Sequence, residues 1–388
     1  MRPSFCHVAG FVGHALDWSR LDSSGTAPGA RGPACDAMLI GTSLSLSGRF
    51  RRQGEQARDG LQLWIEYARD AGPRPVPRLI VLDDESRASV AQAHARRLLA
   101  EHQVDVLVGP YSSGLVHAVA PIADGAGKVL WNHGGTSDAI LQAGARRVVS
   151  VASPASDYLR SLPAWGRRRV AVVNRVTVLH AGSGTFASEV ARGAAEGARA
   201  AGCVDVRVVP FESPLLDARA LCREAAMWDP DLVVSVGTFE DELAVARQRT
   251  ILPERTVLAL VAAGLAAFGD ELGPLAEGII GPSQWEPAAG DGPSWDPTRT
   301  RSWPPSKWPF IDRPEYPAAQ AFAIGLILME CRRRCGGSLG DAALLGAARA
   351  LETTTFFGGF RLNPQTGRQV GHGIRLVRWQ DGRKRVVD

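Results

Sequence analysis

Apolar and polar residues alternate between two spacings from Met38 onward. Short apolar runs, typical of buried strands, are separated by segments in which apolar residues recur every three or four positions, as on one face of a helix. The expected strands are 39–44, 79–82, 104–108, 129–131, 170–173, 204–209, 232–236 and 257–261. Strands that alternate with helices of about 10 to 15 residues predict βαβ units and parallel sheets.

These strands fall into two successive groups, and each group has its own helices. The expected helices are 57–68, 90–99, 186–201, 218–227, one from about 240, 318–331 and 339–351. Because the alternation runs through one group and then restarts, the pattern predicts an α/β protein with two doubly wound parallel-sheet lobes. Turn signals at 363–367 and 381–382 predict hairpins in the last part of the chain.

Residues 1–36 contain glycine, proline, serine and alanine without any period. A secretory signal needs a basic start and an uninterrupted apolar stretch, but Arg2 is the only early cation, and His7 and His14 interrupt the apolar residues. We interpret the segment as a poor export signal. We expect a disordered extension or a start assigned too far upstream, with the folded chain beginning near Met38.

Residues 286–315 also break the rhythm and predict a long irregular loop, because glycine, proline and tryptophan recur there. We expect its tryptophans to pack over a lobe, and covering a ligand site or meeting a partner are the alternatives. The tryptophans in and next to this loop include Trp285, Trp295, Trp303 and Trp308.

The composition is that of a globular chain, since 45% of the 388 residues are apolar and 22% are charged. The 44 lysines and arginines nearly balance the 40 acids, so no basic field indicates nucleic acid as a partner. The longest apolar run, 257–268, is shorter than the roughly 20 residues of a membrane span.

Six cysteines occur without a C-x-x-C pair, so we expect no zinc ribbon and no disulfide scaffold. Cys203 and Cys222 are expected in the core. Cys331 and Cys335, four residues apart, suit one face of a helix. Ordinary helix packing is the interpretation we favour for them, and a metal ion or a disulfide is the alternative.

Motifs of catalysis and cofactor binding are missing from the sequence. It has no phosphate loop, no G-x-G-x-x-G at the first helix of either lobe, no G-x-S-x-G and no H-E-x-x-H. We therefore expect no enzyme, no cofactor and no metal site. His94 lies on an apolar helix stripe and is expected in the core. His133 follows a strand, and we expect it to shape the structure or a ligand site rather than to act as a base.

Two strand-to-helix junctions of the first lobe carry the informative residues: 109–114, with the sequence GPYSSG, and 132–137, with the sequence NHGGTS. A helix N-terminus has unpaired N–H groups and about half a positive charge. Two such ends at the carboxyl edge of one parallel sheet could balance a carboxylate without a cationic side chain. N-capping by serine and threonine is the alternative, while the glycines let the backbone approach a ligand closely.

Seven segments carry a resemblance to a known family. They are GTSLSLSG at 41–48, LDDES at 82–86, VGPYSS at 108–113, APIA at 120–123, GGTS at 134–137, GPSQW at 281–285 and YPAAQA at 316–321. In this order and spacing, the chain from Met38 onward resembles the type I periplasmic binding proteins of the leucine/isoleucine/valine-binding class, the solute receptors of amino-acid and amide ABC transporters. The resemblance implies two lobes joined by a hinge of three crossings, with the ligand held between them.

With that fold, the expected domains are an irregular N-terminal extension and two discontinuous lobes. The extension is 1–37. The N-terminal lobe comprises 38–155 plus 282–352, and the C-terminal lobe comprises 156–281 plus 353–388.

The resemblance also implies which residues meet the ligand. Ser112 or Ser113, with the backbone near Gly135 and Thr136, would hold the ligand carboxylate or amide. The full expected set is Tyr111, Ser112, Ser113, His133, Gly135, Thr136, Phe186, Asp241 and Tyr316.

In the second lobe, the family uses an acid for the ligand ammonium group and an aromatic residue in the cleft. The acid falls on Asp241, with Glu240 as an alternative, and an acid that stabilises its own helix dipole is the other interpretation of both. The cleft aromatic residues fall on Phe186 and Tyr316, although Phe186 could equally belong to the core.

The sequence departs from the family at Gln53, a position that often carries an aromatic residue and that Arg51 and Arg52 flank here. That departure favours a more polar or more acidic ligand, or it marks a solvated surface. Branched-chain amino acids, other amino acids, amides, urea and aromatic acids all remain open as ligands.

The predicted function is capture of a small amino acid or amide, without a chemical reaction, for the permease of an ABC importer outside the cytoplasm. A cytoplasmic ligand sensor of the same fold is the first alternative, because the export signal is poor. An enzyme on this scaffold is the second alternative.

Overall fold

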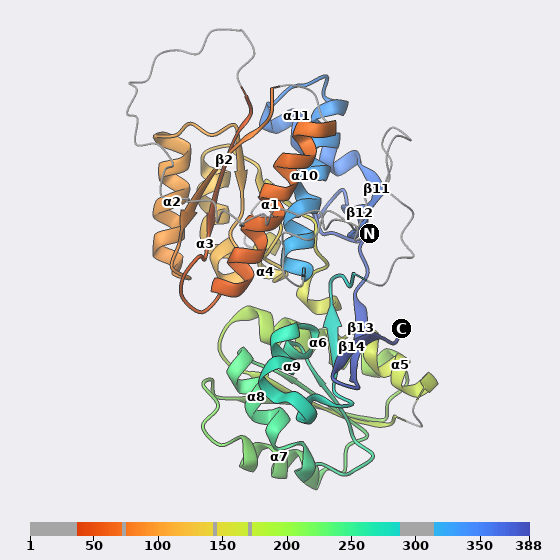
Figure 1. Ribbon diagram of the computed structural model, residues 1–388. Coiled ribbons are helices and arrows are strands. Elements are labelled where there is room, and N and C mark those ends of the chain that lie inside the picture. The colour runs from red at the N-terminus through yellow and green to blue at the C-terminus, as the bar shows by residue number, and fades with distance from the viewer. Residues whose placement is uncertain (1–36, 72–74, 143–145, 170–172, 288–313) are drawn as a thin grey trace, which may run out of the picture. The chain divides into compact units, whose positions relative to one another are not determined.

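The computed structural model describes residues 37–71, 75–142, 146–169, 173–287 and 314–388 (Figure 1). All but residue 37 of the expected extension, with its poor export signal, lies outside these residues. So do Trp295, Trp303 and Trp308, and their expected packing is a prediction only.

The first lobe is built on a parallel five-stranded sheet of order β2-β1-β3-β4-β5. Val106 and Val108 lie in the core on one face of this sheet and Leu107 in the core on the other, as the period of two requires. The strands are β1 (Leu39–Leu44), β2 (Arg78–Asp83), β3 (Val106–Val108), β4 (Leu130–Asn132) and β5 (Val148–Ser150).

Helices cover both faces of the first sheet (Figure 1). One core contains α1 (Arg51–Ala71), α10 (Tyr316–Arg334) and α11 (Asp341–Ala350). The other contains α2 (Ala88–Ala100) and α3 (Ser113–Gly125), with the short α4 (Ala139–Gln142) beside them. Helices α1 and α10 approach closely because Gly60 has no side chain: a Cβ there would lie 2.2 Å from the carbonyl oxygen of Ala318.

The second lobe repeats the same strand order. Its sheet runs β14-β13-β10-β9-β8-β6-β7, so its five parallel strands follow the order of the first sheet and an antiparallel hairpin extends its edge. The strands are β6 (Arg175–Ala181), β7 (Asp205–Phe211), β8 (Leu232–Val236), β9 (Val257–Leu260), β10 (Ile280–Ser283), β13 (Arg375–Gln380) and β14 (Arg383–Val386). The helices are α5 (Leu162–Arg169), α6 (Thr185–Ala200), α7 (Ala218–Met227), α8 (Phe239–Arg247) and α9 (Ala266–Leu272).

The predicted α/β fold with two doubly wound lobes is therefore confirmed, and one expected strand is misplaced. We expected a strand at 170–173, but Val173 is not in a strand and the strand is Arg175–Ala181. Residues 170–172 lie outside the described part. The observed strand is fixed by its pairing with β7 on one side and β8 on the other.

The chain passes between the two sheets three times, after β5, after β10 and before β13. One amide side chain ties these crossings together. Gln284 accepts from the Ser153 amide and donates to the Ser153 carbonyl, both at 3.0 Å. Ser153 Oγ donates to the His372 carbonyl at 3.0 Å, and the His372 ring contacts the Gln284 carbonyl at 2.9 Å. The hinge is thus a hydrogen-bonded unit.

A two-stranded hairpin, β11 (Glu352–Thr355) and β12 (Gly358–Arg361), precedes the last crossing. Phe357, Phe360 and Leu362 pack in the core of the first lobe. The expected domain boundaries remain a prediction. The packing of this hairpin against the first lobe concerns the last expected boundary, at 352/353.

The expected burial of Cys203 and Cys222 is confirmed, and within the described residues they are free thiols together with Cys331 and Cys335. In the same residues, no group of three or more His, Cys, Asp or Glu side chains is placed to hold a metal ion. None of the described helices has both the length and the apolar character that a membrane crossing requires.

Candidate functional site

The candidate site lies where the order of each sheet reverses. In the first sheet β1 has β2 on one side and β3 on the other, so the connections that follow β1 and β3 leave on opposite faces. Ligands of open α/β sheets bind at such a point, outside the carboxyl ends of the strands. The segment 109–113 follows β3, and the segment 133–137 follows β4.

The two predicted junctions meet through one serine. Ser113 Oγ accepts hydrogen bonds from the amides of Thr136, at 3.1 Å, and Ser137, at 3.0 Å. Tyr111 and Gly134 also form a parallel β-bridge. Serine at the first position of α3 therefore links the end of β3 to the end of β4.

The amides that we expected to face a ligand already have acceptors. The Thr136 amide donates to Ser113, and the Gly135 amide donates to Asn132 Oδ1 at 2.8 Å. Asn132 also donates from Nδ2 to the Gly135 carbonyl at 2.6 Å, so Gly135 is buried and held on both sides. A ligand carboxylate would have to replace these acceptors or use the hydroxyls beside them.

Ser112 has a backbone conformation that favours glycine, with φ 88° and ψ 146°. It caps α3, and its Oγ accepts from the Leu115 amide at a long 3.4 Å. A non-glycine residue in this region costs on the order of 1–3 kcal/mol, and such residues gather at functional sites. The strained backbone therefore suggests that the Ser112 side chain has a function at this position.

Replacing Ser112 with glycine should stabilise the fold by about 1 kcal/mol, because glycine adopts this conformation freely and the lost cap is weak. Urea unfolding measures the change. Ser113→Gly is the control of opposite sign, because glycine costs stability within helix α3 and the bridge to Thr136 is lost. Equal destabilisation by both changes would contradict the strain at Ser112.

Aromatic side chains surround the two junctions. Tyr111 and Tyr316 lie with their hydroxyl oxygens 3.5 Å apart, and the Phe50 ring lies 6.2 Å from that of Tyr111. Tyr158, in the first crossing, packs edge-on against Phe186 of α6 at 5.4 Å. Burial raises the pKa of Tyr111, Tyr158 and Tyr316, so all three are neutral phenols.

Tyr158 is a site residue that the sequence did not indicate. Hydrogen bonds to Gln284 and Thr136 oppose the effect of burial on its pKa. The residue thus connects the hinge to the second junction. It stands in no motif, and only its place in the crossing could have identified it.

His133 is fully buried at the end of β4. Burial lowers the pKa of its ring to about 4, with the Gly109 backbone acting in the opposite direction. A ring with so low a pKa is a weak base, which favours the expected shaping role over that of a general base. His94, expected in the core, is half-buried, with Nδ1 3.2 Å from Ser43 Oγ.

A model of the periplasmic binding protein family matches residues 38–384 of this chain. The chain belongs to the periplasmic binding protein family. The match covers both lobes and the three crossings, as the seven sequence segments suggested.

Solved structures of binding proteins are similar over the same region. A leucine-binding protein, LivK, from Thermotoga maritima has 16% identity and a TM-score of 0.78, covering 91% of this chain and 98% of that one. LivJ from Streptococcus pneumoniae, in complex with isoleucine, has 15% identity and a TM-score of 0.73, covering 91% and 99%. A solute-binding protein from R. palustris, in complex with benzoate, has 19% identity and a TM-score of 0.71, covering 91% and 96%. At these identities the likeness shows the fold.

In this periplasmic binding protein, the predicted ammonium partner Asp241 is buried and already paired. Its carboxylate accepts from Ser213 Oγ at 2.6 Å, the Leu215 amide at 2.7 Å and the Thr238 amide at 3.0 Å. Burial alone would raise the pKa of Asp241, but these hydrogen bonds outweigh burial, and the pKa is lowered. With Thr238 it forms the capping box of α8, whereas Glu240 is exposed. To bind an ammonium group, Asp241 would have to keep these donors and also reach the ligand.

A second acid that the sequence did not indicate joins the lobes of this binding protein. Glu189 on α6 is buried and accepts from Ser137 Oγ at 3.0 Å, the Asp138 amide at 2.8 Å and the Ala139 amide at 2.9 Å. Thr185 lies 2.9 Å from the same Ser137 hydroxyl. The start of α6 thus closes on the second junction.

The basic residues around Gln53 do not present a free cation to the site. Arg52 pairs with Glu315 at 3.1 Å and with Asp270 at 3.5 Å. Glu315 is buried and also accepts from the Ala266 amide at 2.7 Å, where α9 begins. Arg52 therefore belongs to a contact between α1 and α9.

Proposed function

We propose that the chain is the solute-binding receptor of an ABC importer and captures a small amino acid or amide between its two lobes. Ser113 carries the proposal, because its hydroxyl brings both junctions together at the point where ligands of this fold bind. Ser112, Thr136 and the phenols of Tyr111 and Tyr316 would then orient the polar end of the ligand. Phe186 would pack against its side chain.

The proposed partner is a membrane permease, and the proposed location is periplasmic or otherwise extracytoplasmic. Membership of the family supports both, and so do the solved relatives described as ABC transporter components. Recovery of the protein in an osmotic-shock fraction tests the location. Retention with the cytoplasm would favour a ligand sensor of the same fold.

Capture needs only closure of the two lobes. When the lobes close, water leaves the space between them, and polar contacts to the ligand strengthen in the lower dielectric. Neutral phenols and hydroxyls suit this role because they bind either a donor or an acceptor. The proposed ligand therefore leaves the protein chemically unchanged.

An aromatic acid is the second candidate ligand, and two observations favour it. Phe50, Tyr111, Tyr158, Tyr316 and Phe186 supply flat surfaces for a ring. The acids nearest the junctions and the one predicted for the amine are each held by several donors. An aromatic carboxylate needs no such acid, and one relative of this fold is described in complex with benzoate.

Thermal shift with leucine, leucinamide, urea and benzoate tests the function and separates the two ligand classes. A ligand at 100 times its dissociation constant adds about 2.7 kcal/mol, which is readily measured. Ser113→Ala should weaken every ligand that binds. Asp241→Asn should weaken only ligands with an amine, and an unchanged affinity for leucine would remove Asp241 from the site.

The matched control is Ser188→Ala, which removes an exposed serine hydroxyl of α6 outside the junctions. It should bind like the parent chain. If no ligand class raises the melting temperature, or if Ser113→Ala binds as tightly as Ser188→Ala, the proposed site is wrong.

A further inference from the structure

A cavity of about 310 Å³ lies in the second lobe, away from the junctions. It opens between the 3-10 turn Arg249–Ile251 and the start of β9, at the amino end of the parallel strands. The candidate ligand site lies at the carboxyl ends, so the cavity belongs to the opposite edge of the sheet. Leu252, Pro253 and Leu258 give it an apolar wall.

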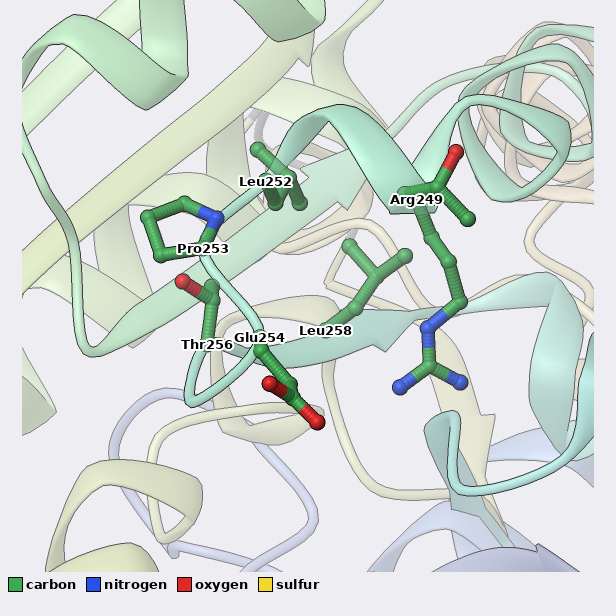
Figure 2. A pocket seen from close by; sticks show the side chains of 7 residues that line it. Arg249, Leu252, Pro253, Glu254, Thr256 and Leu258 are labelled. Carbon is green, nitrogen blue, oxygen red and sulfur yellow. The ribbon is translucent and has the colours of Figure 1, made fainter.

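Two charged side chains lie at this cavity. Figure 2 shows the Arg249 guanidinium and the Glu254 carboxylate extending in the same direction, with Leu258 between them in the view. Within the described residues, neither has an ion-pair partner. Arg249 is half-buried, and Nη1 donates to the Glu277 carbonyl. That bond leaves its second amino group for a ligand.

A second guanidinium lies close to that of Arg249. A Cβ on Gly278 would be 3.5 Å from Arg249 Nη1 and 3.5 Å from Arg378 Nη2, so one small space separates the two groups. Arg378 lies on β13 opposite Arg385 of β14. The neighbouring carboxylate of Asp381 accepts a hydrogen bond from the Arg385 guanidinium, at 3.0 Å.

Arg378 Nε is buried and has no hydrogen-bond partner in the part of the chain that the structure describes. A buried donor without an acceptor is costly and rare. Two adjacent guanidinium groups without a carboxylate add like-charge repulsion. An anion between Arg249 and Arg378 would remove both costs, since guanidinium groups pair with carboxylates through two parallel hydrogen bonds.

We propose that Arg249, with Arg378 behind it, forms the anion-binding end of a second ligand site whose apolar end is this cavity. The ligand class is a small monocarboxylate with an aliphatic body, which the wall of Leu252, Pro253 and Leu258 covers. The ligand should carry only one negative charge, because the exposed carboxylate of Glu254 at the same cavity would repel a second one. The site is independent of the proposed function, because none of its residues belongs to the junctions.

Titration calorimetry of the full chain with 4-methylpentanoate, and with its uncharged amide, tests the proposal. The carboxylate should bind and the amide should bind at least about tenfold more weakly, the loss expected for a charged hydrogen bond. Arg249→Gln and Arg378→Gln should each weaken the carboxylate by a similar factor. Glu254→Gln should bind it more tightly.

Arg247→Gln is the matched control, because Arg247 is exposed two residues before Arg249 and does not line the cavity. It should bind like the parent chain, and so should Ser113→Ala, which alters only the first site. The proposal is overturned if the carboxylate does not bind at millimolar concentration or if the amide binds equally well. It is also overturned if Arg247→Gln loses as much affinity as Arg249→Gln, or if Ser113→Ala alone abolishes binding.

Discussion

Replacing Asp138 with alanine should lower the free energy of unfolding by about 3 kcal/mol, the lower part of the range for breaking a buried ion pair. The Asp138 side chain is only 4% exposed and pairs with Arg368, whose segment forms the last crossing. It also accepts from the amide and hydroxyl of Ser156, at 3.2 and 3.1 Å, in the first crossing. The change would leave Arg368 with the carboxylate of Asp157 and the hydroxyl of Ser156 as partners.

Glu196→Ala is the matched control for Asp138→Ala. Glu196 also pairs with two arginines, Arg160 and Arg192, but its side chain is 40% exposed. Solvent-exposed pairs contribute between zero and about 1 kcal/mol. Urea unfolding of both variants measures the difference. Equal effects would show that Asp138 is no more important to the hinge than a surface acid.

The fold was predictable because the spacing of apolar residues reports burial directly. Parallel strands are buried on both faces, so they appear as continuous apolar runs, and nearly every run became a strand. The misplaced strand shows the limit of this rule. Val173 ends an apolar run, yet pairing with β7 and β8 selects Arg175–Ala181, where three polar residues interrupt the apolar ones. Pairing is a property of distant segments, so a local run cannot report it.

The first half of the site was predictable for a similar reason. Both junctions follow buried strands, so their meeting at one sheet edge follows from a parallel topology. The roles of single side chains did not follow. No sequence motif near Glu189 or Tyr158 indicates that helix α6 contacts Ser137 or that the first crossing places a tyrosine against α6. Those contacts join segments that are distant in the sequence.

Asp241 had a local signal that favours a structural role. Thr238 stands three residues before it, which is the spacing of a capping box. The capping box leaves the neighbouring Glu242 to face the interior. That side chain is 1% exposed, and it accepts from the Gly237 amide at 3.1 Å and the Ala262 amide at 2.6 Å. It therefore joins the carboxyl ends of β8 and β9.

Glu242 should make the stability of the second lobe fall as the pH rises. Burial raises the pKa of its carboxyl from 4.5 to about 8, despite the hydrogen bonds from Ala262 and Gly237, and Asp241 adds to the increase. In the unfolded chain the group ionises above pH 4.5, whereas in the folded chain it keeps its proton to about pH 8. Folding then takes up a proton between these values. The free energy of unfolding loses about 1.4 kcal/mol per pH unit from this group, about 5 kcal/mol in all.

Glu242→Gln should remove that dependence, because an amide carries no charge at any pH. At pH 5 the variant should be less stable than the parent chain by about 1–2 kcal/mol, since its amino group faces a backbone N–H. At pH 8 it should be at least as stable, because the parent chain has then lost the contribution of the neutral carboxyl. Urea unfolding at both pH values measures the change in this difference. Glu240→Gln, the same substitution on an exposed residue of α8, should show the same difference from the parent chain at both. A pH-independent difference for Glu242→Gln as well would mean that the buried carboxyl is ionised in the folded protein.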